Sequence, residues 1–449
     1  MPRDITKTKN LNPKTGPIAV AAAQSLASLY GYDVDGEIVA LPNDTIQMAM
    51  EFQGEASFSY SDLESFFKKS DLTNQGICNV IGPFNSDYPS PESTLDVQYL
   101  SAAGLGATNW FYTTDQWMYY MTQDIFALDT VPHVMSMSYG WSEAQQCSIG
   151  GEACQQLGLD NDKYVKRINT EFQKLGLRGT SIFVSSGDSG VNGRTDPSCT
   201  DSTFHATFPG GSPYVTSVGG TEMKPGTVQY GFHDIPICNN VTVNTTQSNS
   251  TPIQCFVKGT ERAISFDQNS FASGGGFSNI SVRPSYQDAA VRQYFANAGS
   301  TLPPQSMWAK GGRGFPDVAS LGANYLTMLA GGVTPVSGTS ASAPMWAGLA
   351  SRLINVAQQN DGKPLGFLNP LLYKAYDEAP AAFTDITEGD NKCTENGCDG
   401  CQGFTCVKGW DPVTGLGSPN YKALAAYIFI LSSKTFSFLN KSDLFVFPT

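Results

Sequence analysis

The sequence predicts an α/β fold with a mostly parallel central sheet and helices on both of its faces. Short apolar runs alternate along the chain with segments of helical periodicity. Several of these runs are apolar on both strand faces, which is typical of parallel strands covered by helices on two sides. A chain of 449 residues has the length of two or three average domains, or of one large α/β unit with insertions.

The elements follow one another without an internal repeat. Strands are predicted at 45–52, 133–140, 181–188, 214–220 and 325–331, and helices at 61–69, 90–104, 162–176 and 345–359. The start of the helix over 90–104 is well marked, because Ser90 is a good N-cap and Pro91 suits the first helical position. Segments that leave this pattern are expected to be insertions, at 143–160, 222–272 and 387–408.

Composition limits the classes of function. Hydrophobic residues make up 41% of the chain and charged residues 15%, which indicates a globular protein with a sizeable core. The net charge of −13 argues against nucleic-acid binding, which needs basic surfaces. The same charge suits a protein that works in acid, where protonation of carboxylates lowers self-repulsion.

Cysteines and glycosylation sequons indicate the secretory route. The chain has ten cysteines and six N-x-S/T sequons, at Asn43, Asn240, Asn244, Asn249, Asn279 and Asn440. Three sequons crowd between Cys238 and Cys255, which predicts a disulfide-closed, glycosylated surface loop. The first ten residues contain no apolar signal region, so the expectation is a start further upstream or a processed chain. The apolar run 424–431 is too short to span a bilayer, and no membrane span is predicted.

Glu92 and Asp96 stand four residues apart and therefore on one face of the helix over 90–104. Like charges at this spacing destabilise a helix by a few tenths of a kcal/mol. A solvated helix face is the simplest explanation, but the residues around the two acids are apolar. A carboxylate base with an orienting partner is the alternative.

Ser340 lies in a run of small residues at the start of a helix pattern. Backbone N–H groups and the positive end of the helix dipole favour a developing oxyanion there, although a capping serine would look the same. The pattern G-x-S-x-S disfavours an α/β-hydrolase elbow. None of the three histidines, His133, His205 and His233, stands in a setting expected of a base, and Glu92 would supply one instead.

Asp188 follows the predicted strand 181–188 in a tight glycine turn. Ligands of open α/β sheets bind beyond the carboxyl ends of the strands, so Asp188 is a candidate site residue. An ordinary Asx-turn is the alternative.

Together these stretches resemble the sedolisin family, the serine-carboxyl peptidases with a subtilisin-like fold, and within it the tripeptidyl peptidases. The resemblance covers roughly residues 13–425 apart from the insertions. It rests on eight segments in the family's order, at 92–104, 131–140, 178–190, 208–221, 272–291, 313–320, 337–349 and 409–421.

The resemblance implies a role for each matching residue. Ser340 matches the nucleophile, Glu92 the general base, Asp96 the carboxylate that orients it, and Asp188 the oxyanion-hole aspartate. Ser138, Tyr139 and Gly140 match the segment along which the substrate backbone lies. Glu51 matches a further acid of some members only loosely and is not assigned. The implied reaction passes through an acyl-enzyme in acid, with negligible activity at neutral pH.

A structural calcium ion is also implied. The matching ligands are the carboxylates of Asp385 and Asp411 and the carbonyl groups of Ile386, Val407 and Gly409, an all-oxygen set that Ca²⁺ prefers. The chain has Val407 where relatives carry glycine.

Four cysteines at 393, 398, 401 and 406 have spacings that could suggest zinc. Disulfides are the better interpretation in a secreted protein. Elsewhere in the chain, Cys147–Cys154 and Cys238–Cys255 are expected to close local loops, and Cys78 has no local partner. The family implies one link from the cluster to the region of Cys199 and another pair inside the cluster.

The expectation is thus a single catalytic domain over 1–449, with a glycosylated insertion at 222–272 and an extension at 426–449. Family members are zymogens whose N-terminal propeptide is removed in acid, and the chain leaves no room for one; a full-length protein would have its own propeptide as a partner. The expected activity is release of tripeptides from free N-termini of peptides or proteins, in a lysosome, a vacuole or outside the cell. Alternatives are an endopeptidase of the same family and a secreted glycoprotein that has lost catalysis.

Overall fold

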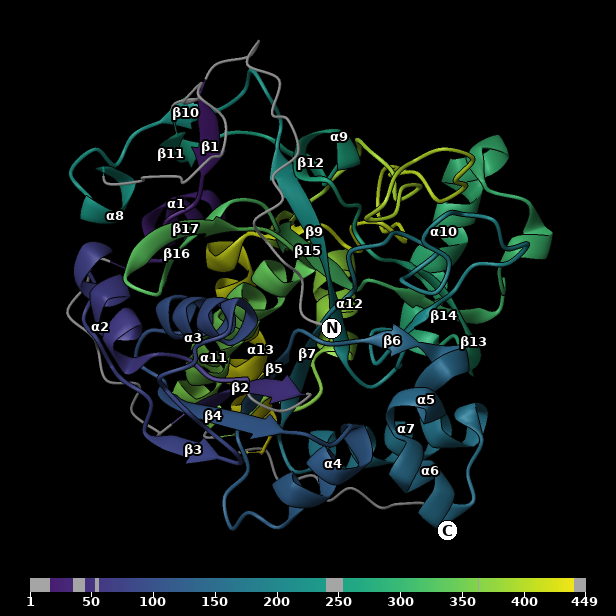
Figure 1. Ribbon diagram of the computed structural model, residues 1–449, viewed down its shortest axis with the longest axis horizontal. Helices are drawn as coiled ribbons and strands as arrows, with labels where there is room; N and C mark the ends of the chain where they lie inside the picture. Colours follow the sequence, from purple (N-terminus) through teal and green to yellow (C-terminus); the bar gives the residue numbers. More distant parts are fainter. Residues whose placement is uncertain (1–16, 35–44, 53–55, 240–252, 362, 440–449) are drawn as a thin grey trace.

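A central sheet organises the part of the chain that the computed structural model describes, which is residues 17–34, 45–52, 56–239, 253–361 and 363–439 (Figure 1). Adjacent strands run parallel except at one edge, where β12 is antiparallel to β9. This confirms the predicted mostly parallel sheet. From one edge to the other the strands are β12 (Glu261–Ala263), β9 (Thr216–Met223), β7 (Ser181–Ser185), β5 (Val134–Met137), β2 (Ile46–Phe52), β4 (Thr108–Thr114) and β3 (Asn79–Ile81), and β15 (Val318–Leu321) also pairs with β9.

Helices cover both faces of this sheet, as predicted. The longer ones are α1 (Ala23–Tyr30), α2 (Tyr60–Lys69), α3 (Pro91–Ala103), α4 (Met118–Phe126), α7 (Asn161–Leu177), α10 (Asp288–Ala298), α11 (Thr339–Asp361), α12 (Asn369–Glu378) and α13 (Tyr421–Leu439). The short ones are α5 (Gln146–Ile149), α6 (Gly151–Leu157), α8 (Pro236–Asn239) and α9 (Phe266–Asn269), with 3-10 turns at Glu143–Gln145, Ser285–Gln287, Gly299–Thr301, Gln305–Met307 and Pro380–Ala382.

The strand register decides which side chains face which helices. Ala49 lies beside Phe111 on the neighbouring strand, and both belong to the core cluster that includes residues of α3 and α11. Their neighbours Met50 and Tyr112 point to the opposite face, where α4 and α7 pack. Because side chains alternate along a strand, Glu51 lies on the same face as Ala49, beneath α3 and α11.

Smaller sheets surround the central one, and two expectations change. The segment 325–331 was predicted as a further strand of the main sheet, but it forms β16 (Tyr325–Leu329) of a separate antiparallel hairpin with β17 (Gly332–Val336). The helix predicted at 345–359 begins earlier, at Thr339.

Four further small sheets complete the described structure. One contains β1 (Ile18–Val20), β11 (Ile253–Lys258) and β10 (Gln229–Tyr230). The others are two-stranded, formed by β13 (Gly276–Val282) with β14 (Gly312–Phe315), β18 (Phe383–Thr384) with β19 (Ser418–Pro419), and β6 (Trp141–Ser142) with β8 (Thr207–Phe208).

The predicted insertion at 222–272 is partly built into the fold, because β12 adds an edge strand to the central sheet and β11 pairs with β1. Its three crowded sequons lie outside the described residues, as do Asn43 and Asn440, whereas Asn279 is exposed. Within the described ranges, no helix combines the length and the apolar character that a membrane crossing requires.

The disulfides follow the sequence expectation. Two local loops close through Cys147–Cys154 and Cys238–Cys255, and the cysteine-rich segment is held by Cys199–Cys401 and Cys393–Cys398. The thiols of Cys78 and Cys406 are free. Since three of the four clustered cysteines are in disulfides, the zinc interpretation fails.

Candidate active site

The helix α3 begins at Pro91 and carries Glu92 and Asp96 in its first two turns. The Ser90 hydroxyl accepts a hydrogen bond from Ser93 N–H at 3.1 Å and thereby caps the helix. Asp96 is fully buried and Glu92 is half-buried. The two carboxylates therefore do not form a solvated helix face.

A third carboxylate, that of Glu51, joins this pair from the end of β2. Burial, and then the charge of Glu92, raise the pKa of Glu51 to about 8. Burial, followed by the charges of Glu51 and Glu92, raises the pKa of Asp96 well above its usual range. The Tyr139 hydroxyl donates a hydrogen bond to Glu51 Oε2 at 2.9 Å. In acid the cluster therefore holds protons, which relieves the repulsion between its members.

Sequence reasoning did not assign Glu51 to the site. A usable signal was present, because Glu51 is the one charged residue in a strand that is buried along its whole length. A buried charge needs a partner or a proton. Tyr139 was expected only to lie along the substrate, and its side chain also has this second contact.

Ser340 is the second residue of α11, directly after the β16–β17 hairpin. Pro344, four residues later, has no N–H and cannot donate to the Ser340 carbonyl group. The Ser138 hydroxyl lies 3.4 Å from that carbonyl oxygen and donates to it. The Ser138 side chain also favours the ionised form of Asp96, against the larger effect of burial, so it lies near that carboxylate. Ser138 is therefore located between the turn that carries Ser340 and the buried acid of α3.

Direct packing fixes α3 against α11. A Cβ atom on Gly348 would lie 2.6 Å from Ala103 Cβ and 2.6 Å from Gly104 N, so only glycine allows the two backbones to approach this closely. Gln47 bridges the helices, accepting a hydrogen bond from Ser351 Oγ at 2.8 Å and donating to a main-chain carbonyl of α3 at 3.1 Å. These contacts fix how α3, which carries Glu92, packs against α11, which carries Ser340.

Asp188 lies next to Ser340 as well. Its Oδ1 atom accepts hydrogen bonds from the N–H of Thr339 at 2.7 Å and from Thr339 Oγ1 at 2.8 Å. A Cβ atom on Gly338 would stand 3.2 Å from Asp188 Oδ2 and 3.6 Å from Ser340 Cβ. The structure thus brings Asp188 to the start of α11, which an isolated Asx-turn would not do.

The segment Ser138–Gly140 leaves the end of β5 beside these groups and is half-buried. A Cβ atom on Gly140 would lie 3.3 Å from the carbonyl oxygen of Phe208. Phe208 belongs to β8, which pairs with β6, the strand that follows Gly140 in the chain. The segment is therefore held at both ends: Ser138 donates a hydrogen bond to the Ser340 carbonyl group, and Gly140 packs against the main chain of β8.

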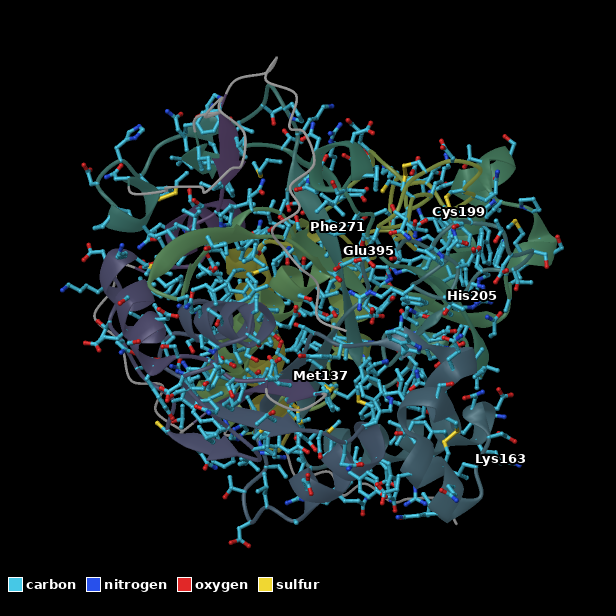
Figure 2. All side chains as sticks on the ribbon, in the orientation of Figure 1. Met137, Lys163, Cys199, His205, Phe271 and Glu395 are labelled. Atoms are coloured by element: carbon cyan, nitrogen blue, oxygen red, sulfur yellow. A yellow bond between two sulfur atoms is a disulfide. The ribbon has the colours of Figure 1, made fainter. Side chains whose placement is uncertain are left out.

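Two of the histidines have structural contacts. His133 Nδ1 accepts a hydrogen bond from the N–H of Ile46 at 3.0 Å, and burial lowers the pKa of His133. His205 Nε2 lies 2.7 Å from Asp201 Oδ2. Figure 2 shows His205 well apart from Met137 at the end of β5. These positions agree with a carboxylate, rather than an imidazole, as the base beside Ser340.

The predicted calcium ligands lie close together near the C-terminal end of the chain. Asp411 is fully buried and accepts a hydrogen bond from Val407 N–H at 3.1 Å. Asp385 accepts one from Gly409 N–H at 2.9 Å. Both carboxylates act electrostatically on Tyr376. Burial raises the pKa of Asp411 to about 7 in spite of its N–H donors, so the ionised carboxylate would gain from a nearby cation.

The backbone suits this ligand set. Val407 does not have a positive φ, so its side chain causes no backbone strain, whereas Gly409 has a φ of 88°. Ile386, the remaining predicted ligand, follows Asp385 in the chain and is buried. Two carboxylates with three carbonyl groups fit a hard cation such as Ca²⁺.

Another acidic group lies elsewhere. Within the described part of the chain, Asp196, Asp201 and His205 form the one group of three possible ligand side chains, with atoms within 4.8 Å of one another. The Asp196 carboxylate already accepts the N–H groups of Thr200 and Asp201, each at 2.9 Å. These hydrogen bonds account for the arrangement without a metal.

Buried carboxylates should make the folded protein more stable in acid than at neutral pH. Burial raises the pKa of Glu51 to about 8 and that of Glu143 to about 7, from 4.5 when unperturbed. Groups with a raised pKa stabilise the folded state fully below their unfolded pKa, and this stabilisation is lost as the pH rises through the folded value. We expect the Tm to fall as the pH is raised from about 4.5 to about 8. In the Glu143→Gln variant the decrease in Tm between about pH 4.5 and pH 7 should be smaller. Thermal unfolding across this range tests it; a rising Tm would contradict it.

Comparisons with known proteins agree with this geometry. Residues 101–385 match the subtilase family. Physarolisin of Physarum polycephalum is 40% identical over 391 residues, covering 86% of this chain, and tripeptidyl-peptidase 1 of Rattus norvegicus is 34% identical over 392 residues, covering 81%. The chain spans 65% and 58% of the lengths of these two relatives.

A solved structure supports the fold. Pseudomonas sedolisin, a serine-carboxyl proteinase complexed with pseudo-iodotyrostatin, superposes with a TM-score of 0.64 at 22% identity, covering 92% of this chain and 99% of that one. At this identity the likeness speaks for the subtilisin-like fold alone. The chain therefore belongs to the subtilase family and, within it, to the sedolisins, close to tripeptidyl-peptidase 1.

Proposed function

We propose that this chain is an acid-active serine-carboxyl peptidase that cleaves peptide bonds through an acyl-enzyme. One observation carries the proposal: the Ser138 hydroxyl donates to the main-chain carbonyl of Ser340, and the same side chain lies near enough to the buried Asp96 to favour its ionised form. Ser138 is thus located between the acid of α3 and a serine at the start of α11, and Asp188 is held at the same turn by Thr339. A serine with a carboxylate base and an oxyanion donor is a complete set for acyl transfer.

In the proposed reaction Glu92 takes the proton from Ser340 Oγ as this oxygen attacks the peptide carbonyl carbon. Asp96 orients Glu92. The same proton then passes to the leaving amine as the carbon–nitrogen bond breaks, which leaves an acyl-enzyme. Water, deprotonated by Glu92, hydrolyses this ester and restores Ser340.

Protonated Asp188 would donate a hydrogen bond to the oxyanion of the tetrahedral intermediate. The N–H groups at the first turn of α11 would add the positive end of the helix dipole. The carboxylic acid donor requires acid, because a carboxyl group with its reference pKa is ionised at neutral pH and can no longer donate a hydrogen bond.

We further propose release of tripeptides from free N-termini, supported by the 34% identity to tripeptidyl-peptidase 1. The test incubates the protein at pH 4 with one peptide in free and in N-acetylated form, and identifies the products by mass spectrometry. Tripeptides from the free form alone support the proposal. Internal cleavage of both forms would show that the protein is an endopeptidase. If neither form is cleaved, and the protein gives the same result as the Ser340→Ala control, the protein is a binding glycoprotein without catalytic activity.

We propose a Ca²⁺ ion held by Asp385, Ile386, Val407, Gly409 and Asp411. Bound there, the ion would neutralise two carboxylates and fix the loop that connects them, so its part is structural. Removing it should lower the Tm, because binding to the folded state alone stabilises that state. Thermal unfolding with a chelator, and then with Ca²⁺ restored, measures this shift. Asp385→Asn should reduce it, whereas an unchanged Tm for the parent protein would count against the site.

The disulfides and the sequons bear on where the whole protein is located. Four disulfides support an oxidising compartment, so we propose the secretory route, to a lysosome, a vacuole or the exterior, with glycans on the sequons. Residues 1–449 would form one catalytic domain, with 426–449 as an extension, made as a zymogen with its own propeptide.

A further inference from the structure

Thr339 stands between Asp188 and Ser340, and neither the sequence nor the proposed mechanism gives its side chain a task. It is 1% exposed and makes three short contacts. Its N–H and its hydroxyl both reach Asp188 Oδ1, at 2.7 and 2.8 Å, and the N–H of Gly187 reaches Thr339 Oγ1 at 3.1 Å.

The contact with Gly187 fixes the direction of the Thr339 hydroxyl. An N–H group can only donate, so Oγ1 accepts from Gly187. The hydroxyl then has its one proton left for Asp188 Oδ1, 2.8 Å away. Asp188 is therefore held by two donors from the same residue, both on the same carboxyl oxygen.

This arrangement distinguishes the two oxygens of Asp188. Oδ1 serves as a double acceptor, so a proton on the carboxyl group is placed on Oδ2. Oδ2 lies 3.2 Å from the position that a Cβ atom on Gly338 would occupy, and Ser340 N lies 3.5 Å from the same position. A proton on Oδ2 would thus be carried into the region that the Ser340 N–H group also borders.

We propose that Thr339 is a positioning residue that sets both the orientation of Asp188 and the oxygen on which Asp188 carries its proton. This inference rests on the proposed peptidase function and adds to it: Thr339 touches neither substrate nor the attacking atom, but it aims the acid that stabilises the oxyanion. An oxyanion exists only in the transition state and the intermediate. Loss of the Thr339 hydroxyl should therefore lower kcat and leave KM unchanged.

The experiment compares Thr339→Val with Thr339→Ser in steady-state hydrolysis of a fluorogenic tripeptide amide at pH 4. Valine keeps the shape and removes the hydroxyl, and serine keeps the hydroxyl. We expect kcat to fall roughly 10- to 100-fold in the valine variant at unchanged KM, and to stay within about threefold in the serine variant.

Thr327→Val is the matched control. Thr327 is equally buried, and its hydroxyl donates to the Thr334 carbonyl oxygen at 2.9 Å inside the neighbouring hairpin. This variant loses one buried hydroxyl hydrogen bond that does not involve Asp188. A lower Tm with an unchanged kcat is expected for it, which separates positioning from a general loss of stability.

A double-mutant cycle with Asp188→Ala gives the decisive comparison. If Thr339 acts through Asp188, the valine substitution has no further effect on kcat once Asp188 is removed. Equal losses with and without Asp188, or a folded valine variant with kcat within threefold of the parent, would overturn the proposal. If the Thr339→Val variant shows no cooperative unfolding and is therefore not folded, the kcat of Thr339→Ala is compared with that of Thr339→Ser instead. A parent protein without peptidase activity would refute the proposed function instead.

Discussion

Ser340→Ala is expected to lower kcat/KM for a tripeptide amide at pH 4 by about 10⁴-fold or more, because the acyl-enzyme can no longer form. Ser340 is half-buried at the start of α11, and its side chain is not part of the core. The variant should therefore bind substrate and unfold at nearly the same temperature as the parent. Single-turnover and steady-state assays on the purified protein measure the loss.

Ser342→Ala provides the matched control in the same turn of α11. The Ser342 hydroxyl is fully buried and lies 3.0 Å from the Ser320 carbonyl oxygen, to which it donates. Its loss should lower the Tm and leave kcat within a few-fold of the parent. Comparable activity of Ser340→Ala and Ser342→Ala would rule out Ser340 as the nucleophile.

Glu92→Gln should reduce kcat/KM by roughly 10²- to 10⁴-fold, the range typical of a lost general base. Glutamine fills the same space and cannot take up the proton of Ser340. The substitution also removes a charge that raises the pKa of Glu51 and of Asp96. The Tm at neutral pH should therefore stay the same or increase, although activity is lost.

The exposed acid of α2, Glu64, gives the comparison for Glu92. Glu64→Gln removes one negative charge from a neighbouring helix without touching the buried cluster, and it should leave both kcat and Tm unchanged. A Glu92→Gln protein with more than a tenth of the parent's kcat would show that another group is the base.

Much of the fold could be predicted because local signals agree with tertiary structure. Ser90 and Pro91 begin α3 where capping rules place them, and the buried apolar runs became adjacent parallel strands. The strand at 325–331 was assigned to the wrong sheet. Periodicity shows that a segment is buried and extended, but pairing with β17 depends on the turn at Ala330 and Gly331, both with positive φ.

The site was less predictable than the fold. Ser340, Glu92, Asp96 and Asp188 were proposed from motifs, and they stay predictions as catalytic residues; in the structure Asp188 contacts the residue before Ser340, and Glu92 acts electrostatically on the buried Asp96. Glu51 comes from a strand remote in sequence, and only the strand register shows that it lies beneath α3.

The position of Thr339 is a similar case. Its sequence context shows only a small residue before a serine, whereas three hydrogen bonds to loops about 150 residues away give it a task. Such contacts depend on tertiary structure, which a local pattern does not record.

The most direct test of the account is the dependence of kcat/KM on pH, measured from pH 3 to pH 8 on a tripeptide amide. A carboxylate base and a carboxylic acid donor predict a maximum in acid and negligible activity at pH 7.5, since Asp188 must be protonated to donate. Equal turnover at pH 4 and at pH 7.5 would contradict the carboxylate mechanism.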